Sequence, residues 1–254
     1  MLKFRHIAIA FLSLVASIQM CSASSTEFVD RARPSKIVEV GVHALVGGSY
    51  ITDNYANCFP EIRQANSNMG VAYGAGAGVT LMLREYFGFG TELNVVANHQ
   101  NINVFTTDAE LSSASNIYLR NSYVYGNIPV FASWRFNVAS TVRWVLDVGV
   151  FYSYGLSGNQ RQTIYRAGLN ALDQMVYNIS EFKTDFFKSL DTFQNAFHRS
   201  NMGIHLGSSL VFRNHFVIGG RAQFGLRNMA YVYNGITTPS MHSINFTFRL
   251  GWRF

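Results

Sequence analysis

Hydrophobic and polar residues alternate along most of this chain with a period of two. In the last twelve residues, 243–254, six large apolar side chains share one parity, and Arg249 and Arg253 share the other. Successive side chains of a strand point to opposite faces, so this pattern predicts a strand with one apolar and one polar face. Seven more segments alternate in this way: 36–48, 71–84, 86–98, 121–136, 142–156, 201–213 and 216–228. We therefore expect eight strands.

The predicted connections fall into two classes of length. Three are short: near Glu85, at about 137–141, and at 214–215. Four are long: 47–70, 99–117, 157–200 and 228–242. Short turns on one side and long loops on the other are typical of an outer-membrane barrel with an even strand count, and a β-sandwich would not sort its loops in this way. The sequence predicts an all-β fold, an eight-stranded antiparallel transmembrane β-barrel.

The first residues have the pattern of a secretory signal. Lys3 and Arg5 precede an apolar stretch at 7–18, which is too short to span a bilayer as a helix, and small residues follow it. We expect a signal peptide at 1–23, an N-terminal periplasmic segment at 24–35 and the barrel at 36–254. Since no later stretch has about 18 consecutive apolar residues, we expect no transmembrane helix in the mature chain.

Composition agrees with a surface that contacts lipid. Charged residues make up 13% of the chain, about half the usual share of roughly 25%. Without Lys3 and Arg5, 18 basic residues remain against 14 acidic ones. The basic residues form no run, which argues against nucleic acid as a partner. Cys58 is the sole cysteine beyond the signal peptide. It could be a reactive or intermolecular thiol, or a chance loop residue.

The polar parity of the strands predicts a charged lumen. An eight-stranded barrel is just wide enough for side chains to fill its interior, which disfavours a conducting pore. Buried charges must be paired, and a planar guanidinium can bind a carboxylate at two points. The residues predicted to form this lumen charge network are Glu39, Arg84, Glu92, Arg135, Arg143, Asp147, Arg221 and Arg249.

Several motifs that could suggest chemistry have a structural explanation. The glycine-rich 74–78 continues a strand and opens no helix, so we interpret it as small lumen residues rather than a phosphate loop. His43 and His205 face the lumen without a third ligand nearby, which favours hydrogen-bonded core groups over a metal site. Loop residues that could serve a hydrolase show no triad spacing: His99, Asp108, Ser112, His198, Ser200, His242 and Ser243. We predict no catalytic residue, cofactor or metal.

The third long loop has a different pattern. Apolar residues recur every three or four positions across 166–198, which is helical spacing. We predict an amphipathic helical insertion there, whose apolar face includes Leu172, Ile179, Phe186 and Phe193. This face could cap the mouth of the barrel, or the loop 157–200 could bind a protein partner, and both can hold.

The order of motifs resembles the PorT-type outer-membrane β-barrel family of Gram-negative bacteria. The resemblance is carried by "VGVHALVGGSY", "GAGAGVTLMLREYFGFGTELN", "YGNIPVFASWRF", "LDVGVFYSYGLSG", "MGIHLGSSLVFRNHFVIGGRAQFGLRNM" and the terminal "FTFRLGWRF", in that order. It implies eight strands and an integral outer-membrane protein. One family member is implicated in assembly of a secretion system, which the resemblance offers as a role for this chain.

These patterns lead to a ranked set of hypotheses. The first is a non-enzymatic, monomeric outer-membrane barrel that contacts outer-membrane lipids and presents loops for interaction or envelope structure. The others are a secretion-assembly component and a lipid- or peptide-hydrolysing barrel enzyme. The terminal residues resemble the signal that the barrel-assembly machinery reads, and they comprise Phe248, Leu250, Trp252 and Phe254.

Overall fold

The computed structural model describes residues 27–59, 61–107, 113–169, 174–187, 197–230 and 239–254. Within these residues the chain forms ten strands and one short helix, α2 (Tyr55–Cys58). The strands are β1 (Val38–Ile51), β2 (Ile62–Asn68), β3 (Gly70–Arg84), β4 (Phe87–Thr107), β5 (Ser113–Ala139), β6 (Val142–Leu169), β7 (Met175–Asp185), β8 (Ser200–Phe212), β9 (Phe216–Gly225) and β10 (Ser243–Arg253). All strand pairs are antiparallel. The predicted signal peptide lies outside the described residues.

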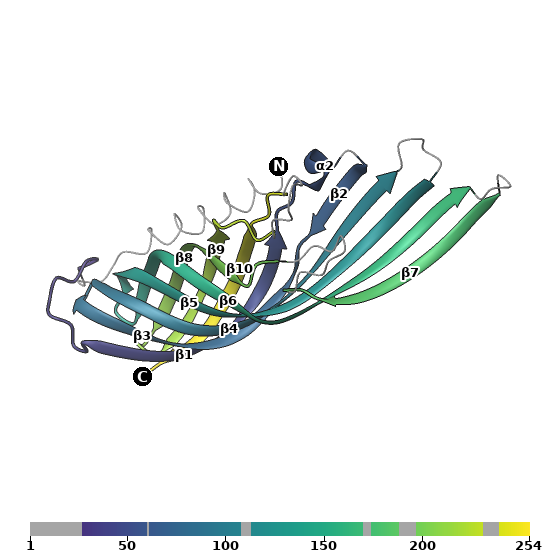
Figure 1. Cartoon of the computed structure of the whole chain (residues 1–254). Helices are drawn as coiled ribbons and strands as arrows, with labels where there is room; N and C mark the ends of the chain where they lie inside the picture. Colours follow the sequence, from purple (N-terminus) through teal and green to yellow (C-terminus); the bar gives the residue numbers. More distant parts are fainter. Residues whose placement is uncertain (1–26, 60, 108–112, 170–173, 188–196, 231–238) are drawn as a thin grey trace.

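Eight of these strands pair in a closed ring (Figure 1). From β1 the pairing passes to β3, β4, β5, β6, β8, β9 and β10, and β10 pairs with β1 again. The closing pair aligns Gly41 with Arg253 and Ile51 with Ser243. The first and last strands therefore meet side by side, and the ring has no unpaired edge.

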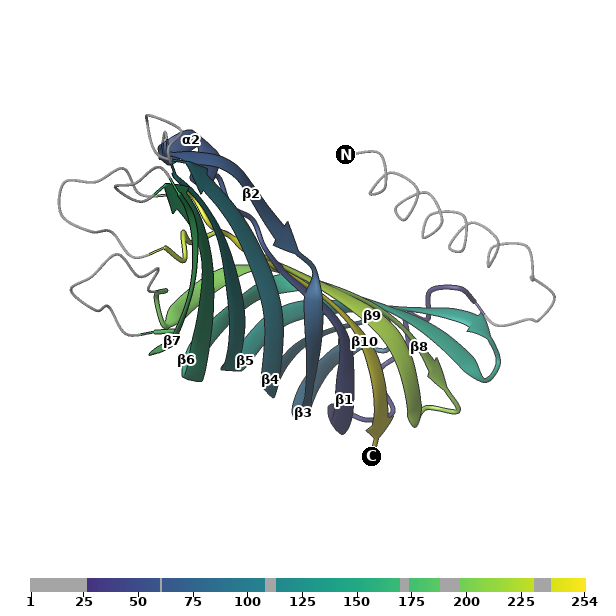
Figure 2. The ribbon, with the colours of Figure 1, turned by 90° about the vertical axis from the view of Figure 1, so that its right-hand side faces the viewer.

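The other two strands belong to an extension beyond one end of the ring. β2 pairs with the outer part of β4, from Asn101 to Thr106, and β7 pairs with the outer part of β6, from Asn159 to Leu169. Together with the outer part of β5 they make a five-stranded sheet in the order β2-β4-β5-β6-β7 (Figure 2). The expectation of eight strands is thus corrected to ten, because three predicted loops continue as strands.

The predicted helix at 166–198 is wrong for 166–169 and 175–185, which are strands, and 170–173 and 188–196 lie outside the described residues. Residues 164–169 complete β6, and β7 returns alongside it, with Leu169 opposite Met175. Residues 175–182 are rich in β-branched and aromatic side chains, which favour strands, and β6 offers them a partner edge. Apolar spacing alone could not separate the two structures, since Val176, Ile179 and Phe182 fit a helical period.

Short turns and both described termini gather at the opposite end of the ring, here called the basal end. The β8–β9 turn has Arg213 and Asn214 at φ of 47° and 63°, the left-handed geometry of a tight hairpin turn. Residues 27–37 pack against this end: the Phe28 and Phe136 rings stack with centroids 5.0 Å apart, and Ser35 N donates to Glu85 Oε2 at 3.1 Å.

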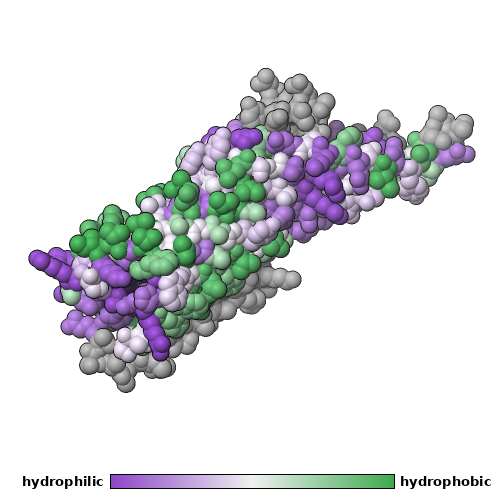
Figure 3. Space-filling model, turned by 90° about the horizontal axis from the view of Figure 1, so that it is seen from below, coloured by the Kyte–Doolittle hydropathy of each residue, from purple (hydrophilic) through white to green (hydrophobic). Residues whose placement is uncertain are grey.

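Side chains on the ring alternate between an exposed outward face and a buried lumen. Along β1, Val38, Val40, Val42 and Val46 are exposed, whereas His43 and Leu45 are buried. The ladder from β4 to β5 skips Ile128 and Pro129, and Pro129 has no N–H to donate. Figure 3 shows hydrophobic side chains over the wall of the ring and hydrophilic ones toward its ends and along the extension. Within the described residues, no helix is both long and apolar enough to cross a membrane.

Candidate functional site

The lumen holds two groups of ion pairs, one near the basal end and one halfway along the ring. The basal cluster consists of Glu39, Arg135 and Arg253. Arg135 donates from Nη1 and Nη2 to the two carboxylate oxygens of Glu39 at 2.7 and 2.6 Å, which is the bidentate geometry that guanidinium favours. Arg253 Nη1 adds a third bond to Glu39 Oε2 at 3.2 Å. The cluster joins β1, β5 and β10 across the lumen.

The central cluster consists of Glu92, Arg221, Arg249, His43 and Asn94. Arg221 Nη2 lies 2.6 Å from both carboxylate oxygens of Glu92, and Arg249 Nη2 lies 3.1 Å from Oε1. All three side chains are buried. A buried charge without a partner is costly, so one carboxylate between two guanidinium groups holds β4, β9 and β10 in place.

His43 completes the central cluster through a neutral ring. Its Nε2 lies 2.6 Å from Asn94 Oδ1 and its Nδ1 lies 3.3 Å from Arg249 Nη2. An amide oxygen only accepts and a guanidinium only donates. The tautomer with the proton on Nε2 satisfies both contacts, and the 3.4 Å approach of Arg221 Nη1 to Nε2 is then no hydrogen bond. His43 is thus a core group, consistent with the sequence interpretation.

Glycines on β3 make room for the central cluster. Gly76 lies opposite Asn94 and Gly78 opposite Glu92. A Cβ at Gly78 would come within 2.6 Å of Glu92 Cγ, and a Cβ at Gly76 would collide with Asn94 Oδ1. The glycine-rich 74–78 therefore acts by its small size inside a regular strand.

The remaining residues of the predicted network lie in three settings. Asp147 is buried and accepts a hydrogen bond from Ser133 Oγ at 2.7 Å, and it lines a cavity with residues of both clusters. Arg143 pairs with Glu85 at 2.8 Å, a partner that the sequence did not predict. Arg84 is a correction: its side chain is exposed, because a bulge between Met82 and Arg84 shifts the face to which it points.

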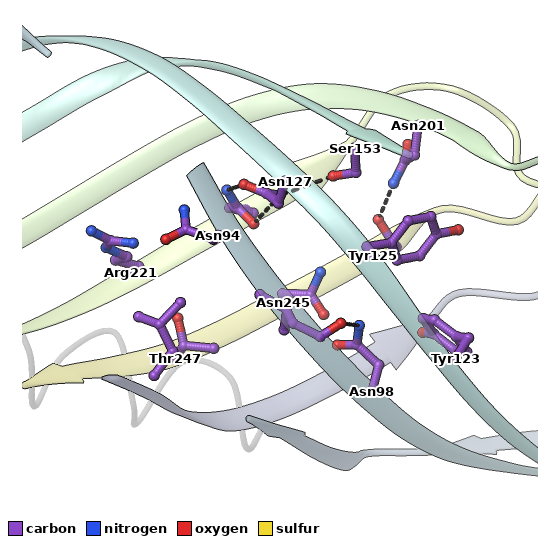
Figure 4. Close-up of a pocket in the computed structure, with 14 residues that line it drawn as sticks. Asn94, Asn98, Tyr123, Tyr125, Asn127, Ser153, Asn201, Arg221, Asn245 and Thr247 are labelled. Carbon is purple, nitrogen blue, oxygen red and sulfur yellow. Dashed lines mark hydrogen bonds between the residues drawn. The ribbon is translucent and has the colours of Figure 1, made fainter. Parts of the chain in front are cut away.

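A polar cavity lies in the lumen beyond the central cluster (Figure 4). Asn127 Nδ2 donates to Ser153 Oγ at 2.8 Å and to Gln223 Oε1 at 3.1 Å, and Asn201 Nδ2 donates to Ser243 Oγ at 2.7 Å. The space between these side chains is about 20 Å³, room for one or two water molecules. Side chains thus fill this part of the lumen.

An apolar cluster, here called the cap, closes the lumen on the side of the extension. Phe186 lies between two parallel rings, 4.4 Å from the Tyr123 centroid and 4.2 Å from that of Phe197. Phe187 packs edge-on against Tyr125, and Met229 and Met241 are buried in the same cluster. Beside the cap, burial and then the nearby charge of Arg227 lower the pKa of His198.

The residues predicted for a shared helix face have different positions in the structure. Phe186 is buried in the cap, whereas Ile179 on β7 is 62% exposed. Leu172 and Phe193 lie outside the described residues. The four residues of the predicted assembly signal, Phe248, Leu250, Trp252 and Phe254, all point outward from the closing strand and are exposed. Their role as a signal stays a prediction.

A family model described as "Outer membrane protein beta-barrel domain" matches residues 32–231. The chain belongs to this family. It is therefore an outer-membrane protein of β-barrel type. The match leaves the finer assignment to PorT-type barrels a prediction. No curated protein sequence matches this barrel protein.

Solved outer-membrane proteins resemble the barrel at low identity. Ail, the attachment invasion locus protein of Yersinia pestis, is 10% identical with a TM-score of 0.37, over 86% of this chain and 100% of Ail. OprG from Pseudomonas aeruginosa is 11% identical with a TM-score of 0.35, over 90% of this chain and 99% of OprG. Neisserial surface protein A is 8% identical with a TM-score of 0.34, over 86% of this chain and 98% of its own chain.

The other candidate groups of the barrel do not form a metal site or a triad among the described residues. In the ranges that the structure describes, no group of three His, Cys, Asp or Glu side chains could hold a metal ion. Ser240 Oγ lies 3.2 Å from His242 Nε2, and His242 Nδ1 is buried without a hydrogen-bond partner in the described part of the chain. Cys58 Sγ contacts Asn54 Oδ1 at 3.6 Å on α2. Asp108 and Ser112 lie outside the described residues.

Proposed function

We propose that this protein crosses the outer membrane as an eight-stranded barrel, carries out no chemistry, and presents its five-stranded extension outside the cell as an interaction surface. The observation that carries the proposal is the long β6–β7 hairpin. It continues from the wall of the ring, and its apolar and aromatic side chains remain exposed, with Tyr177 77% exposed. Exposed apolar surface beyond the membrane-facing wall is typical of binding sites.

The charged groups of the lumen favour a structural role over an enzymatic one. Glu39 and Glu92, two carboxylates that could act as acid or base, are each bound by two arginines. A general acid or base must instead reach the substrate with a proton to exchange. The clusters are also separated from the outside by the cap, whose Phe186 and Phe197 are almost fully buried.

The hairpin can be removed without deleting any residue of the cap. Asn159 and Asp185 are direct partners across the hairpin, so a short glycine-containing turn can replace 160–184. We expect this variant to reach the outer membrane at the wild-type level and to keep heat-modifiable gel mobility. A photo-crosslinker at Tyr177 in the wild-type chain should capture one envelope or extracellular ligand in intact cells, and excess soluble hairpin peptide should compete.

An enzymatic function would give a different result. The purified full chain in vesicles would cleave lipopolysaccharide, phospholipid or peptide, and Ser240→Ala would abolish the cleavage. That outcome would overturn the proposal. A role in secretion-system assembly, as the PorT resemblance implies, would appear as loss of secretion in the hairpin-deletion strain while barrel levels stay normal.

A further inference from the structure

The register of the extension places three basic side chains next to one another. Arg120 on β5 lies directly opposite Arg161 on β6, and Arg161 lies directly opposite Lys183 on β7. Directly opposite residues share one face of a sheet, with Cβ atoms about 5 Å apart. All three side chains are exposed. We call these residues the basic row. They are far apart in the sequence, so no linear motif reveals them.

The basic row lacks the partners that like charges need. Like charges directly opposite one another destabilise a sheet. The ion pairs among the described residues all involve other side chains. Two carboxylates share the face, Glu181 and Asp185, each two positions from Lys183 on β7. Asp185 Oδ1 accepts a bond from Phe187 N at 2.8 Å.

On the side of the basic row toward β4, none of the described neighbours of Arg120 is acidic. Arg120 has Asn101 opposite it on β4, and Tyr118 and Ser122 on either side along β5. The arrangement leaves Arg120 and Arg161 as two adjacent, exposed guanidinium groups. Guanidinium groups bind phosphate with two parallel hydrogen bonds.

The basic row lies just beyond the apolar wall. On the outward face of β5, the last aliphatic residue before the row is Val124, four residues from Arg120. On β6 it is Leu156, five residues from Arg161. Exposed Tyr152 and Tyr154 lie below Leu156 on β6, and tyrosines of this kind mark the membrane–water interface. Long basic side chains at this height can reach lipid headgroups.

We propose that Arg120 and Arg161, with Lys183, bind the phosphate groups of a phosphorylated glycolipid of the outer leaflet. The bound phosphate neutralises the repulsion within the basic row and fixes the extension upright on the membrane. The lipid lies against the outward face of β5 and β6, with its acyl chains along the apolar wall below. This inference rests on the transmembrane orientation proposed above.

The test uses the full chain refolded in phosphatidylcholine vesicles, with and without diphosphoryl lipid A. Diphosphoryl lipid A should raise the unfolding temperature of the wild-type protein, because a ligand that binds the folded state stabilises it. Dephosphorylated lipid A should not. Arg120→Gln/Arg161→Gln should bind the phosphorylated lipid about thirtyfold more weakly, since each basic residue near an anionic surface contributes about a factor of five.

A matched control removes the same charge from elsewhere on the extension. Arg63→Gln/Arg166→Gln changes two exposed arginines of β2 and β6, of which Arg166 lies on the opposite face of β6 from Arg161. This control should keep the wild-type response. In phosphatidylcholine alone, the Arg120→Gln/Arg161→Gln protein should be at least as stable as wild type, because two like charges no longer oppose each other.

Three outcomes would overturn the proposal. The first is an equal rise in unfolding temperature with dephosphorylated lipid A. The second is an equal loss of lipid affinity in both double variants. The third is the same rise in unfolding temperature when inorganic phosphate is added to phosphatidylcholine vesicles, which would indicate a site for soluble anions. If the Arg120→Gln/Arg161→Gln protein does not fold, the response of the wild-type protein to the two forms of lipid A still tests whether the phosphate groups are bound. A wrong membrane orientation would be detected separately, by cysteine labelling of intact cells.

Discussion

At the scale of single residues, the lumen pairs large polar side chains with glycines on the neighbouring strand, and arginines with carboxylates. Glu92 and Asn94 on β4 face Gly78 and Gly76 on β3, so large polar groups lie where the neighbouring strand has no side chain. Arg221 then reaches Glu92 from across the ring. The lumen is thus stabilised by charge pairing in a space that glycine leaves open.

Glu92→Gln tests the charge pairing. It would leave Arg221 and Arg249 buried without the carboxylate that both of them bind, and breaking a buried ion pair costs about 3–5 kcal/mol. We expect a loss of that size in the free energy of unfolding, measured by urea titration in vesicles. Glu181→Gln on the exposed face of β7 is the control, and equal stability of the two variants would contradict the account.

Gly76→Ala tests whether Asn94 needs the space that glycine leaves on β3. Its Cβ would collide with Asn94 Oδ1 and with the backbone of β4, and overpacking costs about 1–3 kcal/mol. Gly126→Ala is the matched control, because its Cβ would meet no atom closer than Leu156 Cδ2 at 3.8 Å. We expect the first variant to unfold at lower urea than the second. A reversed order would contradict the role assigned to Gly76.

Residue parity predicted which side chains enter the lumen, but it could not predict their partners. Arg135, Glu92, Arg221 and Arg249 are buried in the lumen, and Glu39 is partly buried there. The pairings depend on the stagger between strands that are distant in sequence, which no local pattern carries. Arg84 was misplaced because one bulged residue reverses parity, and the sequence does not mark the bulge.

At the scale of elements, the cap and the hairpin have separate tasks although they are adjacent in sequence. β7 ends at Asp185, and the next two residues, Phe186 and Phe187, turn into the mouth of the barrel. Phe197 N donates to Phe186 O at 3.1 Å and His198 N donates to Met229 O at 2.8 Å, which ties the cap to the β9–β10 connection. The cap is thus part of the folded core, whereas the hairpin projects from it.

Phe186→Ala tests this division. Removing a ring stacked between Tyr123 and Phe197 leaves a cavity, and such changes cost about 3–5 kcal/mol. Tyr177→Ala on the hairpin should stay within about 0.5 kcal/mol of wild type. Thermal unfolding of both variants in vesicles gives the comparison, and a larger loss for Tyr177→Ala would show that the hairpin carries the stability.

The elements of the ring were predictable and those of the extension were not. Ring strands alternate cleanly because one face meets an apolar environment and the other a polar lumen, which imposes a period of two. β7 is exposed on both faces apart from Ser180 and its last two residues, so burial imposes no such period on it. Its structure follows from pairing with β6, a contact that sequence spacing alone does not record.

At the scale of the whole molecule, the last strand closes the barrel. Phe254 N donates to Val40 O at 2.9 Å, and β10 pairs with β1 along eleven positions. A closed barrel satisfies the backbone hydrogen bonds of every wall strand, which an open sheet in lipid cannot do. The apolar terminal side chains face outward, where we expect them to meet lipid once the barrel is inserted.

Deleting Phe254 is expected to impair insertion. The deletion removes both the last closing hydrogen bond and the outward terminal ring, which is 62% exposed. Phe254→Tyr keeps both and should be tolerated. The measurement is the amount of heat-modifiable protein in isolated outer membranes, and a normal level of the deletion variant would refute the expectation.

Thiol labelling of intact cells can establish whether the barrel spans the membrane with its extension outside. In a Cys58→Ser background, single cysteines replace Tyr177 on the hairpin, Ser140 in the basal β5–β6 turn, and Val150 on the wall. With a membrane-impermeant reagent, we predict labelling at position 177 in intact cells, labelling at 140 only after permeabilisation, and protection at 150. Labelling at 140 in intact cells, or equal labelling of 150 and 177, would contradict the account.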